Sequence, residues 1–400
     1  DILIGVNQVI MVCFSMAVIS AFIGAKGLGF NLLLALNQLN IGLALEAGLC
    51  ISLIAILLDK MSLAWANKQT DYFGNLTFFQ RNKNTIFFAG SVVIGIILAY
   101  IGTFIFKESF NYLFEVPHNK GISTADFWNK GVDWIFDTFF VYIKAFNTWL
   151  IVDVLQPMRA LYLRMPAVAT LVLAVGAGYI IGGIRSALVV SALTLFIALS
   201  PWWDRALVTL YMATFGVVVS CLIGFSVGTL CFQNKKSAAF MLGVCDIFQT
   251  FPSFVYLIPV MMLFGITDTS VLIAVIVYAT IPATRYTIEG LRSVPVGLHE
   301  AATMSGVNKF QRLTKIEFPL AFPHMMLGLN QTIVFALFMV IIGAFIGTED
   351  LGQYILKALS DKNGAGIGLT LGICVAFIGL IFDNLIRTWV NQRKKHLGIA

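Results

Sequence analysis

Residues 328–347 read GLNQTIVFALFMVIIGAFIG and contain no charged side chain. An α-helix needs about 20 predominantly apolar residues to cross the hydrocarbon core of a bilayer. In that core every backbone N–H and C=O has to be paired within the protein, which a helix achieves along its own length. The stretch therefore predicts a transmembrane helix.

The same stretch occurs near the start of the chain. Residues 5–24 read GVNQVIMVCFSMAVISAFIG and are identical to residues 328–347 at half of the twenty positions, without a gap. Downstream, Leu28, Gly29, Gly48, Cys50, Asp59, Trp65 and Asn67 correspond to Leu351, Gly352, Gly372, Cys374, Asp383, Trp389 and Asn391. Apolar helices resemble each other by chance, but matched Asn, Asp and Trp residues over more than sixty positions indicate a true repeat. Both copies are predicted to cross in the same direction, so the repeat is parallel.

The repeat divides the chain into two unequal parts. Asp1 aligns with His324, so whatever the second copy holds before that residue has no counterpart in the first. We expect residues 1–70 to be the C-terminal part of a first unit and residues 71–400 to be a complete second unit. On this interpretation the chain is a piece of a longer protein in which two units are fused.

The composition extends the membrane prediction to the whole chain. Of the 400 residues, 59% are hydrophobic and 12% are charged, whereas soluble domains carry about a quarter charged residues. We expect an all-α polytopic membrane protein with about ten transmembrane helices, at residues 3–24, 42–64, 85–107, 165–181, 186–200, 206–232, 240–266, 270–288, 322–346 and 367–389. The fourth and fifth are short enough to form a broken pair.

Lysine and arginine indicate the orientation, because short cytoplasmic loops carry more of them than external loops do. The richer set of loops holds Lys68, Arg81, Lys83, Arg185, Lys235, Lys236, Arg292, Lys309, Arg312, Lys315, Arg393, Lys394 and Lys395. The poorer set holds Lys26, Arg205, Lys357 and Lys362. The C-terminus is therefore expected to be cytoplasmic. The net charge of +6 comes largely from these loops and does not indicate nucleic-acid binding.

One external segment, residues 108–164, is too long for a simple turn. Its apolar residues recur at spacings of three to five, and Trp128, Trp134 and Trp149 lie among them. This pattern predicts an amphipathic helix in contact with lipid at the membrane interface. The alternative is a helix packed on the other spans.

Residues that bind metals or carry out catalysis are not gathered in the sequence. The six cysteines form no CxxC pair and the four histidines lie far apart. The phosphate-binding pattern GxxxxGK[ST] does not occur. We therefore expect no metal, no cofactor and no enzymatic activity in this chain.

A polar stretch separates two late spans on the cytoplasmic side, at residues 290–320. From Leu291 it reads LRSVPVGLHEAATMSGVNKFQRLTKIEFPLAFP. Ser293 and Pro295 predict the start of a short helix, and Gly306 is placed to end it with a positive φ. A second short helix is expected at residues 308–316. Pro319 would then mark the re-entry into the membrane.

This loop resembles the EAA loop of ABC importer permeases. The resemblance rests on Glu300, Ala301, Ala302, Gly306, Ile316 and Pro319 at the spacing of that motif. Phe318 departs from the usual leucine but keeps a large apolar group. The resemblance implies the type I importer permease fold and assigns these six residues to an ATPase-coupling loop. That loop would dock on a dimer of ATP-binding subunits, which bind ATP and Mg²⁺ in place of this chain.

Further stretches resemble the glycine betaine/proline permease subfamily. They are GLNQTI, IGAFIGTEDLGQYILKAL and FDNLIRTWV, together with residues 5–29 of the first copy. The resemblance implies import of glycine betaine, proline betaine, choline or a relative such as trimethylamine N-oxide. It also implies a periplasmic or extracellular solute-binding protein and a location in the bacterial cytoplasmic membrane.

Polar residues inside apolar spans are candidates for the translocation path, because they are costly there. The candidates are Asn7, Gln8, Asn330, Gln331, Asp246 and Gln249. Hydrogen bonding between helices is the alternative explanation. A transporter driven by an ion gradient is the alternative function, and the scarcity of acidic residues in the spans disfavours it.

Overall fold

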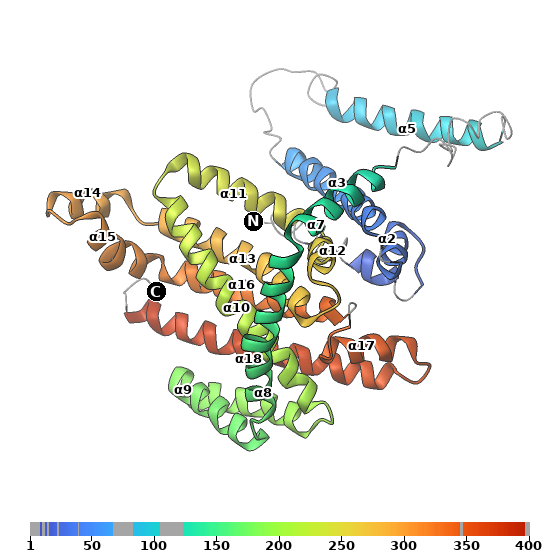
Figure 1. Ribbon diagram of the computed structural model, residues 1–400. Coiled ribbons are helices and arrows are strands. Elements are labelled where there is room, and N and C mark those ends of the chain that lie inside the picture. Colours follow the sequence, from blue (N-terminus) through green and yellow to red (C-terminus); the bar gives the residue numbers. More distant parts are fainter. Residues whose placement is uncertain are drawn as a thin grey trace.

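We analysed a computed structural model of the chain, which describes residues 9, 13, 16–21, 24–38, 40–66, 83–104, 123–344 and 347–396. These residues form helices and no strands, which confirms the all-α prediction. The helices are α2 (Leu28–Asn37), α3 (Ile41–Ala66), α5 (Lys83–Phe104), α7 (Ala125–Trp149), α8 (Gln156–Leu163), α9 (Ala167–Leu199), α10 (Trp203–Phe232), α11 (Lys235–Thr250), α12 (Phe254–Phe264), α13 (Asp268–Arg292), α14 (Val296–Met304), α15 (Lys309–Arg312), α16 (Phe318–Gly343), α17 (Leu351–Ser360) and α18 (Ala365–His396) (Figure 1). Two π-helical turns, η3 (Leu150–Leu155) and η4 (Leu313–Glu317), interrupt them.

The number of spans is close to the prediction but lower. Among the described residues, seven helices are long and apolar enough to cross a bilayer, or eight if the bent pair α11 and α12 forms one span. The predicted span at 3–24 lies mostly outside the described residues. In α5 the apolar part, Ile86–Leu98, is shorter than a bilayer requires. The count of ten was therefore approximate.

The predicted span at 240–266 is not straight, because it consists of the bent pair α11 and α12. The axes of α11 and α12 meet at 91°. Pro252 is the cause, because a proline disfavours the helical conformation of the residue before it. Phe251 accordingly has an extended backbone, with φ −73° and ψ 132°.

The broken pair predicted at 165–181 and 186–200 is present inside α9. Gly183 has a φ of 65°, and the chain folds back there. A Cβ placed on Gly178 would lie 3.0 Å from the Cα of Ala187. In a straight helix Gly178 and Ala187, which are nine positions apart, would be separated by roughly 13.5 Å.

The core of the bundle is formed by α10, α13 and α16, which lie together in Figure 1. Glycines on α10 allow close helix contact, as is common in membranes. A Cβ on Gly224 would lie 2.5 Å from Ala283 Cβ and 2.9 Å from the backbone N of Thr284. Two helices that approach this closely tolerate no side chain at the crossing.

The long helix at residues 125–163 passes the length and hydropathy test for a span, although none was predicted there. Two of its hydrogen bonds nevertheless reach helix ends that are predicted to be external. At its start, Asn129 Oδ1 accepts from Gly42 N (2.7 Å), at the beginning of α3; near its end, Asn147 Nδ2 donates to the C=O of Phe264 (3.2 Å), where α12 ends. Figure 1 shows α7 crossing the bundle between these regions. This geometry favours an interfacial helix, and the placement of 108–164 stays a prediction.

The sequence repeat has a counterpart in the structure. Gly24 and Gly347 occupy equivalent positions and have φ values of 93° and 96°. Each precedes a short helix, α2 or α17, followed by a long one, α3 or α18. A Cβ on Gly352 would meet Ala344, and a Cβ on Gly29 would meet the equivalent Ala21. The two copies therefore pack their short helices in the same way. The division at residue 70 stays a prediction.

Candidate functional site: the cytoplasmic loop

The loop at residues 290–320 extends from the inner end of α13 and stands apart from the bundle, where Figure 1 shows α14 and α15. Pro295 precedes α14 with an extended backbone, so this helix begins one residue after the predicted start. At the base of the loop, Arg292 Nη2 donates to the C=O of Lys235 (3.1 Å), which ties the end of α13 to the start of α11.

Gly306 ends α14, as predicted, with a φ of 72°. Its N–H donates to the C=O of Thr303 (3.1 Å), and the N–H of Val307 donates to the C=O of Ala302 (3.1 Å). This pair of bonds is the Schellman motif, which satisfies the last carbonyls of a helix and requires a left-handed residue. The bend between α14 and α15 therefore depends on glycine.

Replacing Gly306 with alanine is expected to destabilise this bend by about 1 kcal/mol, the cost of a left-handed alanine. No atom lies within 4 Å of the added Cβ, so strain in the backbone is the whole effect. Gly297→Ala is the matched control: it lies inside α14, has equally open surroundings, and should stabilise the helix by about 0.5–1 kcal/mol. Hydrogen exchange of the α14 amides measures the change in local stability in both variants. A change of the same sign in the two variants would contradict the argument.

The second short helix begins as predicted, at Asn308. The Asn308 side chain accepts from Gln311 N (2.8 Å), and Gln311 Oε1 accepts from Asn308 N (3.1 Å), which is a capping box. The helix is continuous through Pro319, from Lys309 to Gly343, and the re-entry into the membrane at this residue stays a prediction. The π-turn η4 shifts the hydrogen-bond register just before Pro319, and proline is tolerated in the first turn of the helix that follows.

A buried carboxylate holds the two short helices together. Glu317 is 2% exposed, and its Oε1 lies 2.9 Å from Arg312 Nε and 3.1 Å from His299 Nδ1. His299 belongs to α14 and Arg312 to α15. Sequence reasoning missed Glu317. The sequence feature that could have identified it is a carboxylate between two apolar residues, Ile316 and Phe318, at the membrane boundary. A charge in such surroundings requires a partner.

The six residues of the predicted motif differ in their exposure to solvent. Glu300, Ala301 and Gly306 are exposed, Ala302 is 5% exposed, and Ile316 and Pro319 are half-buried. Large apolar side chains on the same loop face outward: Val296, Leu298, Met304 and Phe310. Met304 is 90% exposed and Phe310 73%. Exposed apolar patches mark interaction surfaces, so the loop has the character of a docking element.

The candidate path residues that the structure describes engage in contacts between helices. Asn330 Nδ2 donates to Asp383 Oδ1 (2.8 Å), which joins α16 to α18. Arg285 Nη1 donates to Asp246 Oδ1 and to Gln249 Oε1 (both 2.8 Å), which joins α13 to α11. Both contacts favour the structural alternative, although neither tests a role in the path. Gln331 is half-buried in α16, while Asn7 and Gln8 lie outside the described residues.

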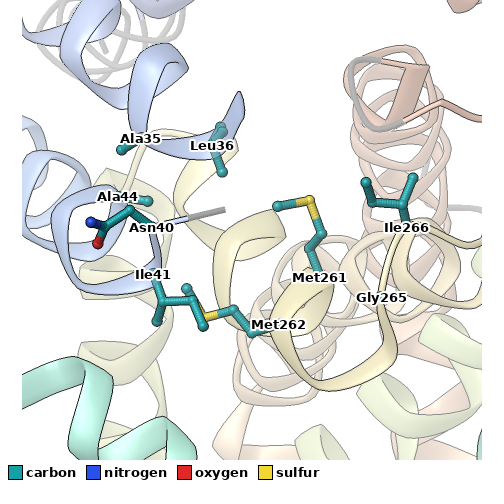
Figure 2. Close-up of a pocket in the computed structure, with 9 residues that line it drawn as sticks. All are labelled: Ala35, Leu36, Asn40, Ile41, Ala44, Met261, Met262, Gly265 and Ile266. Atoms are coloured by element: carbon teal, nitrogen blue, oxygen red, sulfur yellow. The ribbon is translucent and has the colours of Figure 1, made fainter. Parts of the chain in front are cut away.

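A cavity of about 440 Å³ separates the first copy from the second unit. Figure 2 shows its lining, which comes from α2, α3, α12 and the residues beside them: Ala35, Leu36, Asn40, Ile41, Ala44, Met261, Met262, Gly265 and Ile266. Asn40 is the single polar side chain among these nine. The cavity therefore lies between α2 and α3 on one side and the end of α12 on the other.

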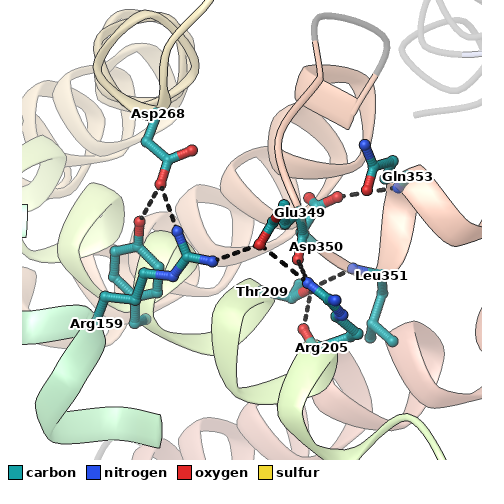
Figure 3. Close-up of polar contacts among 9 residues, drawn as sticks. Arg159, Arg205, Thr209, Asp268, Glu349, Asp350, Leu351 and Gln353 are labelled. Atoms are coloured by element: carbon teal, nitrogen blue, oxygen red, sulfur yellow. Dashed lines mark hydrogen bonds and ion pairs between the residues drawn. The ribbon is translucent and has the colours of Figure 1, made fainter. Parts of the chain in front are cut away.

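A polar cluster joins four elements (Figure 3) and includes Asp268 at the start of α13, whereas the loop follows the end of that helix. Glu349 Oε2 accepts from Arg159 Nη2 (2.8 Å) and from Arg205 Nη1 (3.2 Å). These arginines belong to α8 and α10, and they hold the pKa of the Glu349 carboxyl below its ordinary value. The neighbouring Asp350 is fully buried, caps α17 through Gln353 N (3.1 Å), and has its pKa raised to about 7 by burial.

The buried Asp350 predicts a loss of stability with rising pH. Its folded-state pKa of about 7 exceeds its ordinary value of 3.8, so the folded protein binds the extra proton between these values. The contribution of Asp350 to the free energy of unfolding is therefore fully present below about pH 4, and it is lost as the pH rises through 7. Asp350→Asn retains the helix cap without the charge and should flatten the profile between pH 5 and 8. Thermal unfolding of both proteins across this range measures it, and equal slopes would contradict the assignment.

The helices and the loop together define a class: a polytopic all-α permease of the type I ABC importer fold. Comparison with known sequences agrees. Residues 216–396 match the family described as "Binding-protein-dependent transport system inner membrane component". This match includes the whole loop and the core helices α13 and α16.

Individual relatives narrow the assignment. The chain is 88% identical over 400 residues to the trimethylamine N-oxide transport system permease protein TmoV of Pelagibacter ubique, covering 100% of this chain and 56% of that protein. It is 39% identical over 410 residues to TmoV of Ruegeria pomeroyi, covering 100% of this chain and 60% of that protein. It is also 34% identical over 282 residues to the glycine betaine/proline betaine permease ProW of Escherichia coli, covering 70% of this chain and 78% of that protein.

The chain belongs to the binding-protein-dependent transport permeases, within their glycine betaine subfamily. It spans little more than half the length of the two TmoV proteins that it matches.

Proposed function

We propose that this chain forms the membrane path of an ATP-driven importer for a trimethylammonium solute, with trimethylamine N-oxide as the first candidate. The solute is suggested by the 88% identity to a protein named for trimethylamine N-oxide transport. Glycine betaine is the second candidate, because it appears in the name of ProW, a relative of which this chain covers 78%. The importer would reside in the bacterial inner membrane.

The cytoplasmic loop is the observation that carries the coupling proposal. Its exposed Met304 and Phe310 would pack in a groove of an ATP-binding subunit. Glu317 and the Schellman bend at Gly306 make the two short helices a stiff unit. When ATP and Mg²⁺ close a dimer of such subunits, a stiff docked element is carried along and transmits the motion to α13 and α16.

ATP hydrolysis is assigned to the partner, so this chain acts as a transport subunit and not as an enzyme. A solute-binding protein on the external side would deliver the substrate. The alternative is transport driven by an ion gradient, and two acids in the described spans are already paired with arginines. Asp246 is paired with Arg285 and Asp383 with Arg387, at 2.8 Å and 2.7 Å.

Uptake by proteoliposomes tests the proposal. The complete native permease, of which this chain is a part, would be reconstituted with its ATP-binding subunits and solute-binding protein, and radiolabelled trimethylamine N-oxide supplied outside. We expect accumulation that requires ATP inside and persists when ionophores collapse the ion gradients. Accumulation that follows an imposed ion gradient and ignores ATP would overturn the proposal.

A further inference from the structure

A small cavity lies beside the ion pairs of the external cluster. Its volume is about 220 Å³, and it is lined by Ile151, Leu155, Gln156, Arg159, Tyr211 and Asp268. The volume is several times the ~30 Å³ share of one water molecule in the liquid, so the cavity has room for one small organic solute. Three elements meet there: the end of α7 with its continuation into α8, the outer part of α10 and the start of α13.

Charges of both signs face this cavity (Figure 3). Arg159 Nη1 lies 3.6 Å from Asp268 Oδ2, which is beyond hydrogen-bonding distance. The hydroxyl of Tyr211 donates to the same Asp268 oxygen (3.0 Å). Glu349 holds the other Arg159 nitrogen at 2.8 Å, so the guanidinium is positioned from behind. Arg159 and Asp268 therefore form a long ion pair at the wall of the cavity, with no hydrogen bond between these two atoms.

The rest of the wall is formed by the apolar Ile151 and Leu155, the polar Gln156 and the aromatic ring of Tyr211. Ile151 and Leu155 come from the π-turn η3, and such turns occur frequently at functional sites. The Tyr211 ring lies beside that of Tyr162, with 6.4 Å between their centroids. An aromatic ring attracts a quaternary ammonium through cation–π interaction. The wall therefore suits methyl groups that surround a positive charge.

The two charges restrict the class of ligand. A simple anion would meet the Asp268 carboxylate, and a simple cation would meet the Arg159 guanidinium, so each would be attracted at one end and repelled at the other. A compact dipolar molecule satisfies both. We propose that this cavity binds a small trimethylammonium solute with a negative oxygen, the ammonium toward Asp268 and Tyr211 and the oxygen toward Arg159 Nη1.

The position of the cavity gives such binding a consequence. Asp268 begins α13, whose other end carries the cytoplasmic loop. Over 25 residues this helix spans roughly 37 Å, enough to cross a bilayer. A solute in the cavity would contact the outer end of the same helix whose inner end bears the loop. This inference rests on the proposed function, which supplies the solute.

Direct binding tests the proposal. The complete permease, assembled with its ATP-binding subunits in nanodiscs and without the solute-binding protein, would be titrated with radiolabelled trimethylamine N-oxide. We expect saturable binding that Asp268→Asn and Arg159→Gln each weaken at least tenfold. Tyr211→Phe keeps the ring and should weaken binding less. Tetramethylammonium and pivalate, each carrying one of the two charges, should compete at least tenfold less well than unlabelled trimethylamine N-oxide.

Arg164→Gln is the matched control, because this exposed arginine at the end of α8 does not line the cavity. It should leave the affinity within a few fold of wild type. Thermal unfolding of every variant establishes that the protein is folded. Equal affinity in wild type and Asp268→Asn, or no saturable binding by folded wild-type protein, would overturn the site. If ATP-driven uptake persists in that case, the proposed function stands. Absence of uptake by the complete system would instead remove the proposed function.

Discussion

Replacing Glu317 with alanine is expected to uncouple ATP hydrolysis from transport. The carboxylate is the contact shared by α14 and α15, through His299 and Arg312. Losing a hydrogen bond to a charged group costs about 2 kcal/mol, and 1.4 kcal/mol corresponds to a factor of ten. Transport per ATP hydrolysed should therefore fall at least tenfold. The ATP-binding subunits should retain their basal hydrolysis, because the substitution lies outside them.

Two variants control this experiment. Lys315→Ala removes an exposed charge from the same turn and should leave coupling close to wild type. Glu317→Gln retains an acceptor of the same size and should give an intermediate loss. Uptake and ATP hydrolysis measured in the same proteoliposomes give the ratio directly. A wild-type ratio in Glu317→Ala would show that the two short helices do not need this contact to act as one element.

Replacing Gly224 with leucine is expected to cause the largest loss of stability. The added Cβ would lie 2.5 Å from Ala283 Cβ and 2.9 Å from a backbone nitrogen of α13. Backbone cannot move aside as the end of a side chain can, so α10 and α13 must separate. Overpacking of this kind costs about 3 kcal/mol or more. The thermal unfolding temperature of the purified permease measures the effect.

Gly243→Leu on α11 is the matched control, since no atom lies within 4 Å of its added Cβ. Leucine also favours a helix over glycine, so this variant should be neutral or more stable than wild type. A similar drop in both variants would mean that leucine itself is poorly tolerated in these helices. The close crossing of α10 and α13 would then have no special role.

Local patterns account for the parts of the protein that sequence reasoning predicted. The uncharged run at 328–347 is sufficient for a membrane helix, because the cost of exposing a charge or an unpaired amide to lipid is local. Gly306 and the cap at Asn308 act within five residues, so the end of the first loop helix and the start of the second were predicted nearly correctly. Pro252 and Pro319 show the limit: both are helix breakers by sequence, yet one bends the chain by 91° and the other lies in a continuous helix.

The sequence by itself determined that this protein is a helical membrane permease, and it predicted a parallel repeat and a cytoplasmic coupling loop. Only the tertiary structure decided which polar residues meet. Arg285 and Asp246 are 39 residues apart, and Arg159 and Glu349 are 190 apart. The physical reason is that hydropathy and helix signals act over one helix turn to one span. A charge in a membrane protein, in contrast, is neutralised by whichever helix packs beside it.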